Sequence, residues 1–221
     1  MTQVICLIGP DGTGKTTQAK LLFERLQQEG VKCTYKWMRF NHLFSLPILA
    51  IAKIAGLSET VETKNGLKVG YHYFYKSKII SILYKVTMYL DTLIAYLIKV
   101  QIPKTIFKKT VICDRFIYDT IVDIIISTRD YNFLKSRLGR RFLSLIPKDS
   151  AVILLITNEE ILRKRREDIA LDKYLRDRIS LYLTLKEKFD IFSIDAKEDI
   201  AKIHDIIYKL SIDKLKETGG R

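Results

Sequence analysis

The sequence predicts an α/β fold, a doubly wound and mostly parallel five-stranded sheet with helices on both faces. Short apolar runs bounded by turns alternate with longer helical stretches, and this alternation is typical of parallel sheets with crossover helices. The first apolar run leads directly into a glycine-rich turn and a helical stretch. With 221 residues, 48% of them apolar, the chain can build one domain around a sizeable core.

Five apolar runs are expected to form the strands: 4–8, 32–38, 111–113, 151–156 and 191–194. Helices are expected at 16–29, 43–57 and 77–102, and Gly30 follows the first of them where glycine favours a helix end. Segment 58–70 contains Glu, Thr, Asn and Gly and is predicted to be a loop. We expect one domain over 1–216, with an insertion-like segment at 41–75, a lid near 157–172 and a frayed tail at 217–221.

The formal net charge of +13 suits two kinds of partner. A basic surface can bind nucleic acid, and a basic cleft can equally attract small polyanionic substrates. Charge alone does not distinguish these interpretations.

The compartment is predicted from cysteine use and from the apolar segments. Cys6, Cys33 and Cys113 lie in apolar runs without a CxxC pair, which favours free buried thiols in a reducing compartment. The N-terminus shows no basic region or cleavage site of a signal peptide. Charged residues interrupt the apolar segment 79–102, so a buried helix is expected rather than a membrane span. These features predict a cytoplasmic protein that is not bound to a membrane.

The glycine-rich turn carries the strongest motif in the chain. The motif G-x-x-x-x-G-K-[ST] is matched between the first strand and the first helix. Its glycines let successive N–H groups point at phosphate oxygens, and the helix adds its positive dipole end. Lys15 can bridge the β- and γ-phosphates, and the Thr16 hydroxyl can bind magnesium. The residues expected to bind the nucleoside triphosphate here are Gly9, Pro10, Asp11, Gly12, Thr13, Gly14, Lys15, Thr16 and Thr17.

A second motif, Asp114-Arg115, ends the apolar run 111–113. The carboxyl ends of parallel strands meet at the edge where the glycine-rich turn also lies. Asp114 can hold magnesium with Thr16, and Arg115 can clamp an anionic acceptor group.

A basic cluster follows the fourth strand and contains Arg163, Arg165 and Arg166. Arginines that close over a transferring phosphoryl group balance its negative charge and exclude water. We expect the cluster to be a mobile lid, and a solvated helix face or a nucleic-acid patch is the alternative.

The chain resembles the thymidylate kinase family of nucleoside monophosphate kinases. The resemblance covers nearly the whole length and rests on the glycine-rich turn, 38–40, 113–116, the basic segment after Asn158, and 194–196. It implies a doubly wound P-loop kinase fold and a dimer packed through helices. It also implies transfer of a phosphoryl group from ATP, with Mg²⁺, to dTMP, and small-molecule nucleotides rather than nucleic acid or membrane as partners.

The resemblance also implies roles for single residues. Asp11, Arg39, Arg115 and Phe116 correspond to positions at the acceptor monophosphate, and Asp11 and Lys15 to catalytic positions. Some members carry a catalytic arginine where this chain has Gly12. Members without it carry basic lid residues instead, so Arg163, Arg165 or Arg166 is expected to supply charge in the transition state. The segment Asp195, Ala196 and Lys197 resembles the loop that passes the adenine.

Substrate choice is where the sequence departs from the family. Members usually read thymine with an aromatic residue and an arginine four positions later, and here those places fall near Met88 and Thr92. The aromatic run 71–75 is expected to form a packing layer or a dimer face, and a replacement stacking platform is the alternative. The phosphate machinery is therefore intact, whereas the base-reading residues are altered or moved.

Three other functions remain open from the sequence. One is a kinase of another small acceptor, either another nucleotide or a nucleoside, on the same scaffold. A nucleoside kinase usually has a carboxylate at the end of the second strand, where this chain has Met38-Arg39. A nucleic-acid-binding ATPase would explain the charge, but no known binding module is recognised. A membrane-surface role for segment 43–57 is a minor third possibility.

Overall fold

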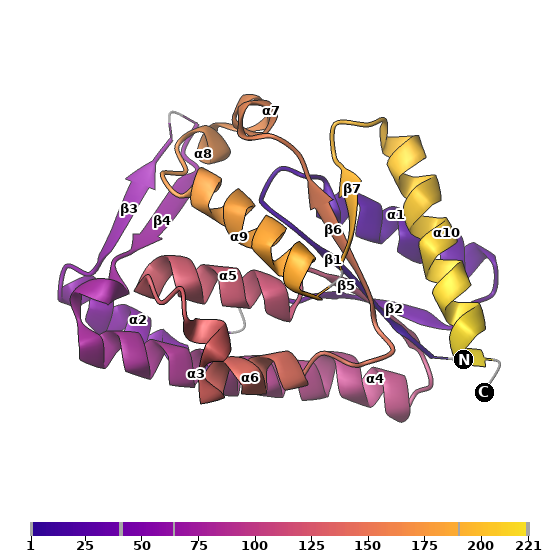
Figure 1. Cartoon of the computed structure of the whole chain (residues 1–221), viewed down its shortest axis with the longest axis horizontal. Coiled ribbons are helices and arrows are strands. Elements are labelled where there is room, and N and C mark those ends of the chain that lie inside the picture. Colours follow the sequence, from indigo (N-terminus) through magenta and orange to yellow (C-terminus); the bar gives the residue numbers. More distant parts are fainter. Residues whose placement is uncertain (1, 40–41, 64, 190, 220–221) are drawn as a thin grey trace.

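The computed structural model describes residues 2–39, 42–63, 65–189 and 191–219, with side chains described as far as residue 214. Its main sheet has five parallel strands in the order β2-β5-β1-β6-β7 (Figure 1). They are β1 (Val4–Ile8), β2 (Cys33–Trp37), β5 (Thr110–Asp114), β6 (Ala151–Ile156) and β7 (Phe192–Asp195). The predicted doubly wound α/β fold is confirmed.

Helices cover both faces of this sheet, because successive residues of a strand point to opposite sides. On β1, Ile5 and Leu7 pack toward α1 (Lys15–Gln28) and α10 (Ile200–Gly219). The alternate β1 residues face a larger core that includes α3 (Lys78–Tyr96), α5 (Ile117–Thr128) and α9 (Leu175–Phe189). Figure 1 shows the two helical layers on either side of the strands. The remaining helices are α2 (Ser45–Ile54), α4 (Ile102–Thr105), α6 (Arg137–Ser144), α7 (Glu159–Arg165) and α8 (Glu167–Ala170).

The predicted loop at 58–70 is wrong, because this segment forms most of an antiparallel hairpin. Strand β3 (Ser58–Glu62) pairs with β4 (Lys68–His72) apart from the main sheet (Figure 1). Asn65-Gly66 lies at the turn, and Gly66 has a φ of 77°. An Asn-Gly pair between short alternating segments is a strong hairpin signal, and here it outweighs the polar composition that predicted a loop.

The long apolar helix expected at 77–102 is buried on one side only. It comprises α3, a π-helical stretch (Leu97–Gln101) and α4. Segment Lys78–Thr105 is long and apolar enough to cross a membrane by length and composition. Only 28% of its most apolar window is buried inside the protein, so most of this window lies at the surface. One of its charged residues, Asp91, is buried and accepts hydrogen bonds from the backbone N–H groups of Phe44 and Ser45 at the start of α2.

The C-terminal segment ends in α10. This helix continues as far as Gly219 through Lys and Glu residues that favour helices, and fraying of the tail from residue 217 stays a prediction. Residues 220 and 221 lie outside the described part, as do Phe40 and Asn41 at the start of the insertion-like segment. That segment consists mainly of α2 and the β3-β4 hairpin.

Candidate active site

The glycine-rich turn runs from the end of β1 to the start of α1. Gly9 has a φ of 138°, and a Cβ at this position would lie 2.1 Å from the Leu155 carbonyl oxygen. Only glycine therefore lets the turn pass so close to β6. Gly14 adopts a left-handed conformation at the N-cap of α1, and Lys15 is buried with its Nζ 2.6 Å from the Pro10 carbonyl oxygen. The turn thus surrounds the lysine and presents the helix N-terminus.

The other residues of the turn lie at the same edge of the sheet. Thr13 is buried and donates to the Pro10 carbonyl, whereas Thr16 and Thr17 are exposed in the first turn of α1. Gly12 lies beneath the lid, because a Cβ there would meet Ile169 Cδ1 at 2.5 Å. A side chain in place of Gly12 would therefore have to displace a lid residue.

Thr16 and Asp114 meet, as expected for a shared magnesium ion. The Thr16 hydroxyl donates to Asp114 Oδ2 at 2.6 Å, and the Tyr35 hydroxyl donates to the same oxygen at 2.9 Å. The second oxygen, Asp114 Oδ1, is buried without a hydrogen-bond partner. Because an unpartnered buried carboxylate oxygen is costly, and because Mg²⁺ prefers such hard oxygen ligands, the residues present fit a magnesium ion.

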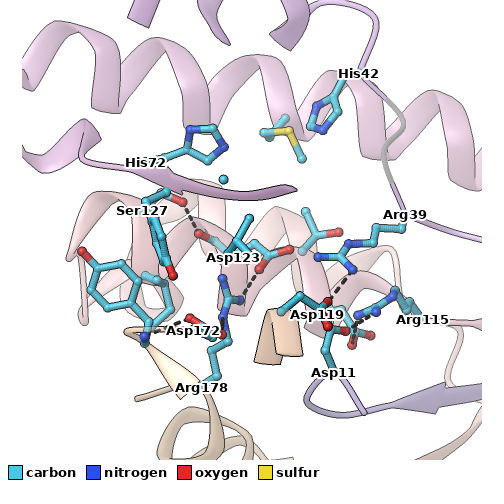
Figure 2. A pocket seen from close by; sticks show the side chains of 18 of the residues that line it. Asp11, Arg39, His42, His72, Arg115, Asp119, Asp123, Ser127, Asp172 and Arg178 are labelled. Atoms are coloured by element: carbon cyan, nitrogen blue, oxygen red, sulfur yellow. Dashed lines mark hydrogen bonds and ion pairs between the residues drawn. The ribbon is translucent and has the colours of Figure 1, made fainter. Parts of the chain in front are cut away.

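Asp11, Arg39 and Arg115 form the acceptor-side cluster (Figure 2). Asp11 Oδ2 lies 3.1 Å from Arg39 Nη1, and Asp11 Oδ1 forms an ion pair with Arg115 Nη2. Lys15 Nζ is 3.9 Å from Asp11. Arg115 has a φ of 69°, a conformation rare for a non-glycine residue and found mostly where a site requires it. The carboxylate therefore holds two arginines beside the P-loop lysine.

The cluster shifts the ionisation of two of its members. Burial alone would raise the pKa of Asp11, but the charges of Arg115, Lys15 and Arg39 outweigh it and hold the pKa well below its usual range. Burial lowers the pKa of Lys15 to about 8, and Arg115 acts in the same direction. Asp11 is therefore ionised at neutral pH, and the lysine lies near its own titration point.

The three arginines of the predicted lid, segment 157–172, have different surroundings. Arg165 donates to the carbonyl oxygen of Gly12 at 2.8 Å and to that of Ala196 at 2.6 Å. Arg163 pairs with Glu159 and donates to backbone carbonyls of the lid itself, among them Ala170 at 2.6 Å. Arg166 pairs with Asp168, and both line a cavity that also includes Asp11, Arg39 and Arg115. Of these three, Arg165 is the one bound to the P-loop.

The segment expected to pass the adenine follows β7. Asp195 is the last residue of that strand, and its carboxylate accepts from the Lys197 N–H at 3.0 Å. Ala196 is buried and donates its N–H to the Ile156 carbonyl at 2.8 Å. Through Arg165 this segment is connected to the P-loop, so the three residues lie at the same edge of the sheet as the phosphate site.

A cavity of about 320 Å³ opens next to Asp11, Arg39, Arg115 and Phe116. Met88 and Thr92 line it from α3, and the hairpin contributes Lys68, Val69, Gly70, Tyr71 and His72. The Tyr71 hydroxyl donates to the Leu171 carbonyl, which joins the hairpin to the lid. Phe74 is buried against Tyr84 at 4.5 Å between ring centroids, so the aromatic run is mainly a packing layer.

The sequence analysis missed a second group of charges in this cavity. Asp123 on α5 and Asp172 after α8 both form ion pairs with Arg178 on α9 (Figure 2). Burial would raise the pKa of Asp123, but the Arg178 guanidinium outweighs it and leaves the pKa below its ordinary value. The sequence gives no signal for the pair of Asp123 and Arg178, because these two residues lie 55 positions apart.

Asp119 is a further buried carboxylate that the sequence analysis did not assign. It accepts hydrogen bonds from the N–H of Gly9 at 3.3 Å, the N–H of Phe116 at 2.8 Å and the Tyr182 hydroxyl at 2.7 Å. Burial raises its pKa. It ties the P-loop, the start of α5 and α9 together beneath the cavity. Within the described ranges no group of three or more His, Cys, Asp or Glu side chains could form a separate metal site.

The glycine-rich turn, a Thr-Asp pair that fits magnesium and an arginine-lined cavity lie at one edge of the sheet, an arrangement typical of P-loop kinases. No family model matches the sequence. A probable thymidylate kinase of Methanocaldococcus jannaschii is 30% identical over 203 residues, which are 90% of each chain. The chain belongs to the thymidylate kinase family.

Proposed function

We propose that the protein transfers the γ-phosphoryl group of ATP to a nucleoside monophosphate, with dTMP as its acceptor. The observation that carries the proposal is the acceptor-side cluster, because Asp11 belongs to the P-loop and also holds the two arginines that line the cavity. A monophosphate bound by Arg39 and Arg115 would lie beside the P-loop phosphates, as in-line transfer requires. The similarity to the probable thymidylate kinase of Methanocaldococcus jannaschii supports thymidylate as the acceptor.

The direct test is ADP release with Mg-ATP against dTMP, dUMP, UMP, CMP, AMP and GMP. We expect the highest kcat/KM with dTMP, and thymidine and DNA serve as negative controls. Turnover of thymidine would favour a nucleoside kinase, and hydrolysis stimulated by DNA would favour a nucleic-acid-binding ATPase. Activity on none of the monophosphates would refute the proposed acceptor class.

Magnesium and ATP are part of this proposal. Thr16 and Asp114 would hold the ion, which would supply positive charge to offset that of the phosphates. Tyr35 would position Asp114 through its hydrogen bond to Oδ2. Lys15 would bind the β- and γ-phosphates, and the segment from Asp195 to Lys197 would border the adenine.

Replacement of the lid arginines should separate their roles. We expect Arg165→Ala to lower kcat about 10- to 100-fold, because a cationic donor next to the P-loop is lost while the acceptor arginines remain. Arg163→Ala is the matched control from the same lid, and its effect should appear mainly in thermal stability because its contacts are within the lid. Steady-state kinetics of both variants would measure this, and a larger kcat loss in Arg163→Ala would contradict the assignment.

The lowered pKa of Lys15 predicts proton uptake on nucleotide binding. Without ligand the side chain loses its proton as the pH rises through about 8, whereas a bound triphosphate favours the charged form. At about pH 9 we expect Mg-ATP binding to take up most of one proton and to be weaker than at about pH 7. Calorimetric titrations in buffers of different ionisation enthalpy measure the uptake, and equal uptake at both pH values would contradict this role of Lys15.

We also propose that two copies associate through the exposed face of α3. Large apolar side chains recur along it at helical spacing and are exposed, among them Ile79, Ile82, Leu83, Val86 and Leu90. A row of exposed apolar side chains indicates an interaction surface. Association through this row would also explain why the apolar helix is only partly buried within one copy. Light scattering should give a dimer mass, and Val86→Lys should give a monomer. We further propose a cytoplasmic location with free thiols, and nucleotides rather than nucleic acid as partners.

A further inference from the structure

The acceptor cavity has an apolar wall and a charged wall. On α3, Tyr84, Met88 and Thr92 line it, and the Thr92 hydroxyl is already donated to the Met88 carbonyl at 2.6 Å. This wall therefore offers ring and methyl surfaces rather than a hydrogen-bonding side chain at position 92. If the cavity is to distinguish one base from another, the hydrogen-bonding side chains that contact the base must come from elements other than α3.

Asp123 and Arg178 supply such groups from α5 and α9. Both line the cavity, where the Arg178 side chain keeps 26% and the Asp123 side chain 37% of its surface accessible. A guanidinium has five N–H donors and a carboxylate has two acceptor oxygens. The ion pairs of Arg178 with Asp123 and Asp172 engage Nη1 and Nε, so the Nη2 donors remain for a ligand. One oxygen of Asp123 is likewise outside its ion pair with Arg178.

The position of this pair relative to the phosphate end completes the argument. Arg39 and Arg115 are already anchored on Asp11, and Arg178 lines the same cavity as these three residues. Figure 2 shows Arg178 between Asp123 and Asp172, with His42 and His72 on the other side of the cavity. A ligand whose phosphate meets Arg39 and Arg115 would thus extend toward the second charged pair.

We propose that Arg178 and Asp123 read the base of the acceptor, with the guanidinium donating to a carbonyl oxygen and the carboxylate accepting from the adjacent ring N–H. A base with a carbonyl oxygen next to a ring N–H fits this pattern, as thymine, uracil and guanine do, whereas cytosine carries an amino group and an unprotonated ring nitrogen at that edge and does not. The inference rests on the proposed function and names the residues that set its specificity. They come from α5 and α9 rather than from positions 88 and 92.

The test separates base recognition from phosphate recognition by calorimetric binding of dTMP, dCMP and 2-deoxyribose 5-phosphate. Arg178→Lys keeps the positive charge between the two aspartates but loses the planar fork. We expect it to weaken dTMP binding about 10- to 100-fold while changing 2-deoxyribose 5-phosphate binding less than about threefold. Asp123→Asn should reduce the preference for dTMP over dCMP by a similar factor.

Two controls make the result interpretable. Arg176→Lys alters an exposed arginine on the same helix, paired with Glu159, and should leave all three affinities unchanged. Thermal melting shows whether each variant is folded. Equal weakening of dTMP and 2-deoxyribose 5-phosphate in Arg178→Lys, or no weakening of either, would overturn the proposal. If the wild type bound none of the three ligands, the proposed function itself would fail, a result distinct from the loss of base discrimination.

Discussion

Replacement of Lys15 by alanine is expected to lower kcat by about 10³-fold or more while the fold remains intact. The ammonium group is the buried cation of the P-loop, and a preorganised charge in such a site stabilises the transferring phosphoryl group far more than it would in water. A loss of this size corresponds to about 4 kcal/mol of transition-state stabilisation. Single-turnover transfer from radiolabelled ATP to dTMP is the appropriate measurement.

Lys20→Ala is the matched control for this variant, because Lys20 is exposed on the same helix α1. It should retain wild-type turnover and the same melting temperature. Transfer at the wild-type rate by Lys15→Ala would refute the mechanism. Loss of activity together with loss of the folded state would instead assign a structural role to the lysine.

Replacement of Arg39 by alanine is expected to raise the KM for the acceptor and to lower kcat/KM about 10²- to 10³-fold. Arg39 lies at the carboxyl end of β2 and is held by Asp11, so its guanidinium is preorganised for an anionic ligand. Charge-assisted hydrogen bonds to phosphate are among the strongest that a side chain makes. The KM for Mg-ATP should change little, since the P-loop residues that bind it are retained.

Arg39→Lys distinguishes charge from geometry at this position. A lysine keeps the attraction to the phosphate but cannot donate two parallel hydrogen bonds, so an intermediate KM is expected. The measurement is initial rate against acceptor concentration at saturating Mg-ATP. An acceptor KM unchanged in both variants would remove Arg39 from the acceptor site.

The phosphate side of the site could be predicted from sequence because its residues are local. The P-loop is a contiguous motif, and Asp114 and Arg115 follow an apolar strand whose carboxyl end must lie beside it. The hairpin was missed although Asn65-Gly66 gave a usable turn signal. Here the polar composition of the segment was misleading.

The base side of the cavity could not be predicted in this way. Arg178 and Asp123 become neighbours only when α9 packs on α5, and neither residue belongs to a recognisable motif. The lid arginines show a related limit. Arg163, Arg165 and Arg166 are equivalent in sequence, and only the carbonyl and carboxylate partners of each distinguish them. The Arg178–Asp123 pair and the contacts of Arg165 to Gly12 and Ala196 join elements that are distant in sequence.

The hydrogen bond from the Tyr71 hydroxyl to the Leu171 carbonyl has a consequence for the order of steps in the proposed reaction. It joins the β3-β4 hairpin to the predicted lid, so in the proposed reaction the lid could not move away without breaking a contact to the hairpin. Departure of the product and departure of ADP would then be linked. If the proposed phosphoryl transfer occurs in this site, opening of the linked segments, rather than the transfer step, would be expected to limit kcat.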